Sequence, residues 1–391
     1  MKGVRMARET PVKSGQLRVG LVARREPGVT GTSRYAARLL ADLPTTEVAV
    51  SPGWPRGVPG PLARAGQNLG VDLGTFFGHY PYRLAATDRD DCDIYHLTTQ
   101  NLATLLLVHR FHKPVVVTVH DIIPYLVRGN RHLTSYAHPL HRLFDTLAMH
   151  GLKRADLLLA DSAWTRGTLI QHLGISGDRV RVVYLGVDTA RFRPREVPDT
   201  FWSRYGLERG NRHLLYVGSE DPRKNLATLL RAFALVSPEW PELRLLKVGA
   251  AHHPAEHDRL IELAESLGIA AKVRWLSTVG EEDLPLFYNA ADLFVMPSYY
   301  EGFGLPVLEA LACGTRVVSS NAAALPEVAG ADCRLCPPTV EGIAEAMREA
   351  LASRADAKDT ATRVAWAQRF SWTRTAAEVR EAYALTCRPG S

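Results

Sequence analysis

The chain has 391 residues, 46% hydrophobic and 23% charged, which is the composition of a globular protein long enough for two separate cores. Its net charge is only +6, from 47 basic and 41 acidic residues, and this weak bias argues against a nucleic-acid-binding protein. No run of about 18 apolar residues occurs, so the sequence predicts no transmembrane helix.

The N-terminal part of the chain predicts a strand, a glycine loop and a helix. Residues 1–16 contain basic side chains but no apolar segment, so we expect a disordered leader and not a secretory signal. Residues 17–23 predict a buried strand, and a helix follows with one apolar face, at Tyr35, Leu39, Leu40 and Leu43. Gly31 in the loop allows backbone N–H groups to come close to a phosphate. The sequence does not decide whether Arg34 lies on the helix surface or contacts a ligand.

Four further apolar runs, at residues 93–97, 114–119, 156–160 and 180–184, predict the rest of a first sheet. His120 and Asp121 follow the second of these runs, and catalytic groups in open α/β sheets gather at the carboxyl ends of strands. A single histidine is more often structural, so the position alone leaves its role open. Before the last strand, Asp161 and Ser162 predict the cap of a helix.

The second half repeats the alternation of strands and helices. Apolar runs predict strands at residues 213–217, 243–248, 272–276, 293–296 and 315–319. Gly218 and Ser219 follow the first of these strands, and Arg223 and Lys224 then stand at a predicted helix start. Two cations there oppose the helix dipole, which a bound anion explains, because charge-assisted hydrogen bonds to phosphate outweigh the dipole penalty.

The most informative stretch is residues 293–314, which predicts a buried strand, a glycine-bearing loop and a helix with Pro306 at its start. Backbone N–H groups at such a start lack intrahelical partners, and the dipole favours an anion such as a diphosphate. Glu301 and Glu309 can accept hydrogen bonds from hydroxyls on either side of that anion. A molecule with hydroxyls on both sides of a diphosphate is a nucleotide sugar. In the alternative interpretation, the two glutamates only stabilise the helix start. The N–H groups concerned belong to Gly302, Phe303, Gly304 and Leu305.

Five scattered cysteines, an odd number, predict a reducing compartment without a disulfide framework. Cys333 and Cys336 have C-x-x-C spacing, but no second pair completes a zinc site, so we expect a short strand with two buried thiols. We therefore expect a cytoplasmic protein. The mild positive charge leaves peripheral contact with the inner face of the membrane open.

Residues 301–318 read E-G-F-G-L-P-V-L-E-A-L-A-C-G-T-R-V-V, which resembles the E-x7-E signature of the retaining glycosyltransferases of family 4, a family that includes many bacterial mannosyltransferases. V-H-D-I-I-P at residues 119–124 is similar to the family's T-x-H-D motif, and residues 186–194 are similar to its G-V-D-x-x-x-F-x-P crossover. The resemblance covers nearly the whole chain after residue 16. It implies an α/β fold of the GT-B type, with two facing Rossmann-like doubly wound domains and the site in the cleft between them.

This fold predicts an acceptor-side domain at residues 17–185, followed by a linker and the start of the second domain at residues 186–212. Prolines and mixed charge at residues 193–199 support the linker independently. The domain that binds the nucleotide sugar then spans residues 213–370, and a helix at residues 371–391 returns to the first domain. In the first domain, residues 51–82 are rich in Gly and Pro, which predicts an irregular surface segment. The sequence does not decide whether this segment contacts the acceptor or only packs its aromatic side chains. Residues 125–142 are basic, and the sequence does not decide whether they contact an anionic acceptor or only solvent.

The resemblance also implies roles for single residues. The histidine of T-x-H-D contacts the transferred sugar, which favours His120. Family members commonly carry an arginine after the strand glycine and a lysine five residues later; here Ser219 and Lys224 take these places, so the arginine's role can pass to Arg223. We expect no metal, because Asp91 and Asp93 precede a strand. The expected catalytic residues are His120, Glu301, Lys224 and Arg223, and the expected donor-binding residues are Gly31, Gly218, Ser219, Gly302, Phe303, Gly304, Leu305 and Glu309.

The implied reaction is hexose transfer, with retention and without a metal or another cofactor, from a nucleoside diphosphate sugar to a glycan or lipid-linked saccharide, as in polysaccharide biosynthesis. P-R-K-N at residues 222–225 favours GDP-mannose over UDP-glucose. No carboxylate is placed as a nucleophile on the far face of the sugar, which favours front-face attack assisted by the departing phosphate. Two alternatives stay open: an epimerase of the same fold, which needs no acceptor, and an inactive nucleotide-sugar-binding protein.

Overall fold

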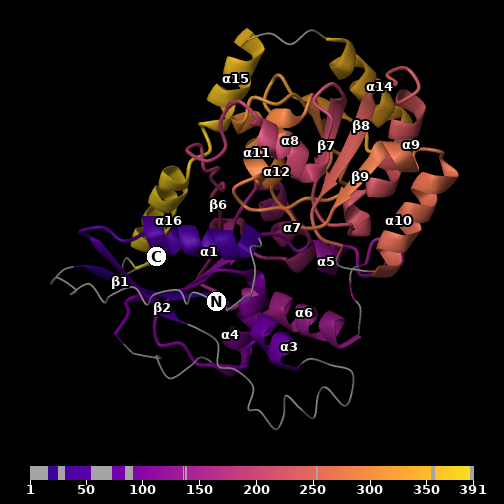
Figure 1. The fold of residues 1–391 in the computed structure, drawn as a ribbon. Helices are drawn as coiled ribbons and strands as arrows, with labels where there is room; N and C mark the ends of the chain where they lie inside the picture. The colour runs from indigo at the N-terminus through magenta and orange to yellow at the C-terminus, as the bar shows by residue number, and fades with distance from the viewer. Residues whose placement is uncertain are drawn as a thin grey trace.

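The computed structural model describes residues 16–24, 31–53, 73–83, 91–134, 136, 139–251, 254–353 and 357–387. In this part of the chain, two six-stranded sheets are each surrounded by helices (Figure 1). All strand pairs in both sheets are parallel. This is the doubly wound α/β arrangement that the sequence predicted. We call residues 16–182 with the last helix the first lobe, and residues 199–367 the second lobe.

The first lobe is built on a sheet with the strand order β2-β1-β3-β4-β5-β6. Its strands are β1 (Leu17–Val22), β2 (Val48–Gly53), β3 (Ile94–Leu97), β4 (Val115–Val119), β5 (Leu157–Ala160) and β6 (Val180–Val182). Its helices are α1 (Gly31–Asp42), α3 (Leu73–His79), α4 (Leu105–Val108), α5 (Ile123–Leu126), α6 (Pro139–Leu152), α7 (Ala163–Leu173) and α16 (Trp372–Thr386).

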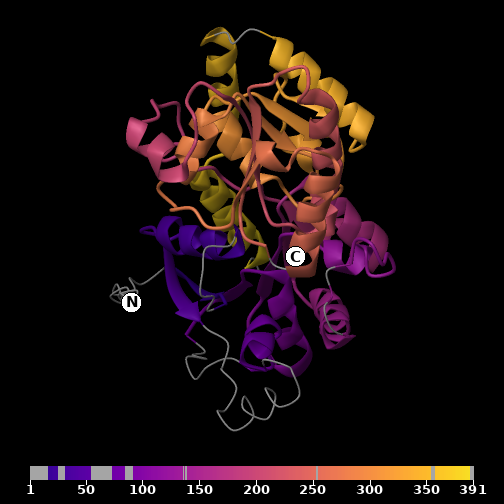
Figure 2. The ribbon, with the colours of Figure 1, turned by 45° about the vertical axis from the view of Figure 1, so that its right-hand side comes forward.

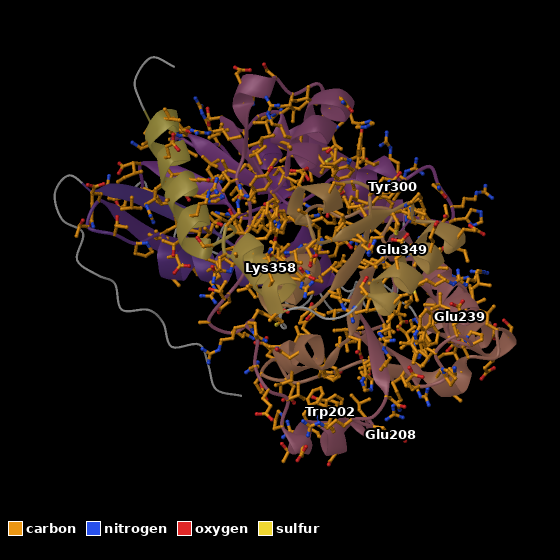
Figure 3. The ribbon with its side chains drawn as sticks, turned by 90° about the horizontal axis from the view of Figure 1, so that it is seen from above. Trp202, Glu208, Glu239, Tyr300, Glu349 and Lys358 are labelled. Carbon is orange, nitrogen blue, oxygen red and sulfur yellow. The ribbon has the colours of Figure 1, made fainter. Side chains whose placement is uncertain are left out.

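The second lobe is built on a sheet with the strand order β12-β11-β10-β7-β8-β9. Its strands are β7 (Arg212–Val217), β8 (Leu243–Val248), β9 (Val273–Leu276), β10 (Leu293–Met296), β11 (Val317–Ser320) and β12 (Arg334–Cys336). Its helices are α8 (Asp199–Tyr205), α9 (Leu226–Val236), α10 (Pro254–Ser266), α11 (Leu284–Ala290), α12 (Leu305–Ala312), α13 (Leu325–Val328), α14 (Val340–Ala352) and α15 (Ala357–Ala367). Glu208, Glu239 and Glu349 lie exposed on its outer surface (Figure 3).

The predicted strands are all present, with ends that differ by at most two residues. Every residue of β3, β4, β5 and β10 is buried, as expected for parallel strands covered on both faces, and this is why their sequences are apolar except for His96 and Thr118. The prediction of an irregular segment at residues 51–82 was wrong at both of its ends. Residues 51–53 belong to β2, an edge strand that tolerates Pro52, and α3 forms around the buried Phe76.

The chain passes between the lobes twice, and the two passages lie side by side. A Cβ atom on Gly186 would lie 2.2 Å from the backbone nitrogen of Trp372, so only glycine fits there. The backbone N–H of Val187 donates to the carbonyl of Phe370 at 3.0 Å. After the second passage, α16 packs against α1 in the first lobe (Figures 1 and 2). Arg380 of α16 donates to the carbonyl of Asp42 at 2.9 Å.

The sequence prediction of two buried thiols in a short strand is confirmed. Cys333 and Cys336 are both buried, and β12 includes the second of them. Among the described residues, none of the helices combines the length and the apolar character that crossing a bilayer requires.

Candidate active site

The loop between β10 and α12 touches the first lobe directly. Gly304, with φ of 111°, is the residue before α12, and its left-handed conformation favours glycine. A Cβ atom on Gly302 would lie 2.2 Å from the carbonyl oxygen of His120, which follows β4 in the first lobe. The Ser162 hydroxyl at the start of α7 donates to the carbonyl of Gly302 at 2.7 Å. The loop thus joins the carboxyl edges of the two sheets.

Glu301 in this loop is the centre of a buried charge cluster. It is 7% exposed, and its Oε1 accepts from Lys224 Nζ at 2.7 Å and from the Ser298 hydroxyl at 2.9 Å. Arg223 Nη1 lies 3.7 Å from Oε2 and donates to the carbonyl of Tyr300 at 2.9 Å. Burial opposes ionisation, but the two cations outweigh it and hold the pKa of Glu301 below its usual value. Glu301 is therefore an ionised carboxylate.

The two cations occupy a different local structure from the one predicted. Arg223 and Lys224 lie in a 3-10 turn, η3 (Pro222–Lys224), and Asn225, with φ of 59°, separates them from α9. Their charge faces Glu301, so a protein carboxylate is the counterion in this structure, where the sequence pointed to a bound anion. The structure does bring Arg223, Lys224 and Glu301 together, as their shared assignment to one site required.

Gly218 and Ser219 follow β7 and lie beside this cluster. A Cβ atom on Gly218 would lie 3.3 Å from Lys224 Cδ, so the glycine allows the lysine to lie close to the backbone. The Ser219 hydroxyl donates to Asp221 at 3.0 Å. Ser219 thus has a local structural partner.

The sequence analysis missed a buried ion pair next to Ser219, in the segment that follows β7. Glu220 pairs with Lys247 on β8, and its other oxygen accepts from His257 Nδ1 at 2.9 Å. Lys247 Nζ also donates to the carbonyl of Gly249 at 2.6 Å. Their separation in sequence left no motif to detect, although a lysine inside an apolar strand was a usable signal.

His120 is held in the first lobe by two acceptors. Its Nδ1 lies 2.6 Å from Asp161 Oδ2, and its Nε2 lies 3.0 Å from the carbonyl of Thr98. Because both partners accept, an imidazolium with two N–H donors satisfies both. Burial opposes this charged form, but the carboxylate outweighs it and raises the pKa of His120. The ring also meets Tyr35 edge-on, with centroids 5.1 Å apart.

Asp161 is a further residue that sequence reasoning missed, because we predicted it as part of a helix cap. Within this lobe Ser162, and not Asp161, caps α7, accepting from the backbone N–H of Thr165 at 3.0 Å. Asp161 turns instead toward His120. Glu327 of α13 adds a second cap from the other lobe, accepting from the N–H groups of Ala163 at 2.7 Å and Trp164 at 2.8 Å.

Glu309 is also buried, at 3% exposure, and both of its oxygens are bound. Oε1 accepts from Arg34 Nη1 at 2.8 Å, and Oε2 accepts from the Tyr288 hydroxyl at 2.8 Å. Arg34 comes from α1, whose first residue is Gly31; a Cβ atom there would lie 4.0 Å from Leu305 Cδ1. The starts of α1 and α12 therefore face each other across the lobes.

Other predicted features lie away from this cluster or outside the described residues. Asp93 is paired with Arg18 at 3.0 Å before β3. Residues 25–30 of the glycine loop and residues 54–72 lie outside the described residues, as do residues 1–15. Arg128 lies over the ring of Tyr125, 3.6 Å from its centroid.

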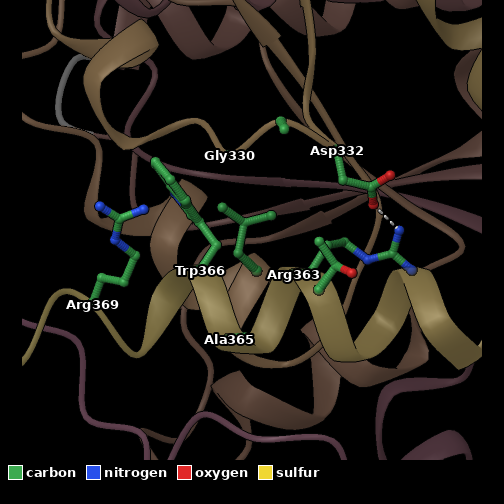
Figure 4. A pocket seen from close by; sticks show the side chains of 9 residues that line it. Gly330, Asp332, Arg363, Ala365, Trp366 and Arg369 are labelled. Atoms are coloured by element: carbon green, nitrogen blue, oxygen red, sulfur yellow. Dashed lines mark hydrogen bonds and ion pairs between the residues drawn. The ribbon is translucent and has the colours of Figure 1, made fainter.

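A pocket of about 240 Å³ lies behind α12 and contains none of the predicted site residues (Figure 4). Trp366 and Arg369 of the α15 region form one wall, and Gly330 and Asp332 form the other. Arg363 crosses this region to pair with Asp332 and to donate to the carbonyl of Gly314 at 2.9 Å. The pocket is thus separate from the charged cluster.

Comparison with known proteins gives matches over both halves of the chain. Residues 201–366 match the family model "Glycosyl transferases group 1", and residues 29–191 match "Glycosyltransferase Family 4". The chain is 33% identical over 314 residues to O-antigen chain mannosyltransferase B of Escherichia coli, covering 78% of each protein. It is 31% identical over 271 residues to the serotype-specific mannosyltransferase WbdA of Escherichia coli, 67% of this chain but only 32% of that longer protein.

Solved structures show the same fold. Sucrose-phosphate synthase from Thermosynechococcus elongatus superimposes with a TM-score of 0.71 at 20% identity, covering 95% of this chain and 99% of the other. The Anabaena protein Alr3699/HepE, solved in complex with UDP-glucose, gives a TM-score of 0.68 at 20% identity, with 94% and 100% coverage. The chain therefore belongs to the family 4 glycosyltransferases of group 1, and it is a hexosyltransferase with the GT-B fold.

Proposed function

We propose that this enzyme transfers a hexose, with mannose favoured, from a nucleoside diphosphate sugar to a saccharide hydroxyl, with retention and without a metal. The observation that carries the proposal is the cluster that Arg223 and Lys224 of η3 form with Glu301 of the loop before α12, close to His120, which follows β4 in the other lobe. Charged groups and hydrogen-bond acceptors from both lobes are thus available to one ligand.

The diphosphate is expected at the start of α12. Two cations face one carboxylate there, which leaves one positive charge in excess, and the helix dipole adds about half a charge more. Lys224 and Arg223 each have N–H donors beyond those that bind Glu301 and Tyr300, so they can bind phosphate without releasing the protein partners. Preorganised donors of this kind stabilise the diphosphate as it leaves.

The two glutamates are expected to bind the sugars on either side of the diphosphate. Glu301 lies next to Gly302, which contacts the His120 carbonyl, so we assign it to the transferred hexose. Glu309 lies further into α12, beside Tyr288, so we assign it to the ribose. Oε2 of Glu301 and both oxygens of Glu309 can each accept a further hydrogen bond, whereas Oε1 of Glu301 already accepts two.

The transfer step is expected on the face of the hexose that the diphosphate leaves. Glu301 and Glu309 are both paired with cations, and neither is free to act as a nucleophile on the opposite face of the sugar, which supports front-face attack by the acceptor hydroxyl. The hydroxyl proton passes to the departing phosphate as the glycosidic bond to the donor breaks and the new one forms. Contact between the lobes limits water and hence donor hydrolysis.

Mannose, and GDP as its carrier, are favoured by P-R-K-N at residues 222–225 and by the relatives named as mannosyltransferases. The name of one relative, O-antigen chain mannosyltransferase B, supports a saccharide chain as the acceptor. We therefore expect a glycan or lipid-linked saccharide acceptor and a role in polysaccharide biosynthesis.

The test is a transfer assay with GDP-mannose, UDP-glucose and ADP-glucose, each with oligomannoside acceptors and with a chelator present. We expect transfer from GDP-mannose in the presence of the chelator, and an α-linked product by NMR of the anomeric proton. An isomerised nucleotide sugar formed from the donor alone would point to an epimerase instead. Failure of GDP, UDP and ADP to bind in calorimetry would contradict the proposal altogether.

A further inference from the structure

The donor site is not complete within the second lobe, because one of its glutamates is held by a side chain of the first. Arg34 lies on α1 and Glu309 on α12, 275 positions apart in the sequence, and they form an ion pair of 2.8 Å. The Arg34 side chain is 32% exposed and that of Glu309 only 3%. The buried carboxylate thus depends on a cation that reaches it from across the cleft.

Each oxygen of Glu309 is oriented by a different lobe. The hydroxyl of Tyr288, a fully buried residue of α11, holds Oε2, while Arg34 holds Oε1. If only the Tyr288 contact were present, the carboxylate would keep a buried negative charge without a cation, which is unfavourable in a low-dielectric interior. The orientation seen here therefore requires both lobes.

Arg34 also keeps one donor available. Its Nε is buried and has no hydrogen-bond partner among the described residues, which is unusual for a buried nitrogen. One turn earlier on the same helix, Gly31 faces Leu305 at the start of α12. Arg34 therefore lies where the starts of α1 and α12 approach each other.

We infer that Arg34 is a positioning residue that orients the carboxylate of Glu309 from the opposite lobe for binding to the ribose of the nucleotide. This inference rests on the proposed function and adds to it a residue of the first lobe that contributes to ribose recognition. A purely structural ion pair would tie the lobes together but would not distinguish one nucleotide from another.

The test uses nucleotides that differ only in the ribose. Binding of GDP and of 2′,3′-dideoxy-GDP is measured by calorimetry for the wild type, Arg34→Met, Glu309→Gln and the double variant. We expect Arg34→Met to weaken GDP binding by at least about tenfold and dideoxy-GDP binding by less than about twofold. The double variant is expected to bind GDP no more weakly than Glu309→Gln alone, because both changes act through one carboxylate.

Arg38→Met is the matched control, since Arg38 lies one turn further along α1 and pairs with Asp188. It should bind both nucleotides as the wild type does. If Arg34→Met does not fold, Arg34→Lys serves in its place, because it keeps the charge but shortens the reach; we expect a smaller loss, again confined to GDP. Equal losses for the two nucleotides, additive losses in the double variant, or no loss would each overturn the inference. A wild type that binds GDP while Arg34→Met binds it equally well overturns only this inference, whereas a wild type that binds no nucleotide overturns the proposed function as well.

Discussion

At the scale of single residues, the site depends on charges that are buried and paired. Glu301 stays ionised at 7% exposure because Lys224 and Arg223 face it. The cluster carries one excess positive charge that can attract phosphate, and removing either cation would cancel that excess. Substitutions here should therefore change catalysis more than surface substitutions of the same type.

Lys224→Ala should lower kcat/KM by about 10- to 100-fold, because a charge-assisted hydrogen bond contributes about 1.5–3 kcal/mol. Steady-state kinetics with a nucleotide sugar measures this. Lys272→Ala is the control. Lys272 precedes β9, so it lies at the amino ends of the strands, whereas Lys224 lies beyond their carboxyl ends. Its Nζ donates to the carbonyl of Ser237 at 2.9 Å. Equal activity of the two variants would exclude Lys224 from the site.

His120 predicts a pH dependence whose sign follows from its partner. Asp161 holds the pKa of His120 above the ordinary value near 6.5, so the stabilising contribution is fully present below that value and is lost as the pH rises through the raised pKa. If the imidazolium takes part in binding the sugar, kcat/KM should fall on the alkaline side. Asp161→Asn should move that fall to lower pH, because the raising carboxylate is gone. A pH profile of kcat/KM checks this, and an unchanged profile would contradict it.

At the scale of elements, the loop between β10 and α12 is positioned by contacts that tolerate no side chain. Gly302 approaches the carbonyl of His120 so closely that a Cβ atom would lie 2.2 Å from it and 2.9 Å from Asp121 Cβ. Glu301 immediately precedes this glycine. The backbone contact therefore sets the distance between Glu301 and the first lobe.

Gly302→Ala should fold but lose about 100-fold in kcat/KM, because the loop must retreat by about an ångström and misplace Glu301. Gly210→Ala is the matched control, since a Cβ atom at Gly210 meets nothing within 4 Å. Kinetics combined with thermal unfolding separates the two effects. A loss of stability without a loss of activity would refute the positional argument.

At the scale of the whole molecule, α16 ties the end of the chain to the first sheet through a buried histidine. His96 on β3 is fully buried, with Nδ1 2.6 Å from the Tyr383 hydroxyl of α16 and Nε2 2.7 Å from the Thr118 hydroxyl. Burial lowers the pKa of His96 to about 3, so this histidine is neutral in the folded protein at any mild pH.

This contact predicts acid sensitivity. The unfolded chain takes up a proton at His96 below about pH 6.5 and the native protein does not, so stability is lost as the pH falls from about 6.5 toward 3. Between pH 7 and pH 5 this group should cost about 2 kcal/mol of unfolding free energy. Urea unfolding of His96→Gln should show a correspondingly weaker pH dependence than the wild type. His150→Gln, at an exposed position of α6, should keep the wild-type dependence.

The sequence by itself determined the strands, the fold class and the grouping of Arg223, Lys224 and Glu301. Buried parallel strands favour nearly continuous apolar runs, and a loop at a helix start requires glycines at particular positions, so both leave local signals. Only the tertiary structure decided the partners: Asp161 for His120, Lys247 for Glu220, Glu327 for the start of α7, and Arg34 for Glu309. These pairs are separated by 27 to 275 positions and meet only when strands and lobes pack, so no local pattern of residues could specify them.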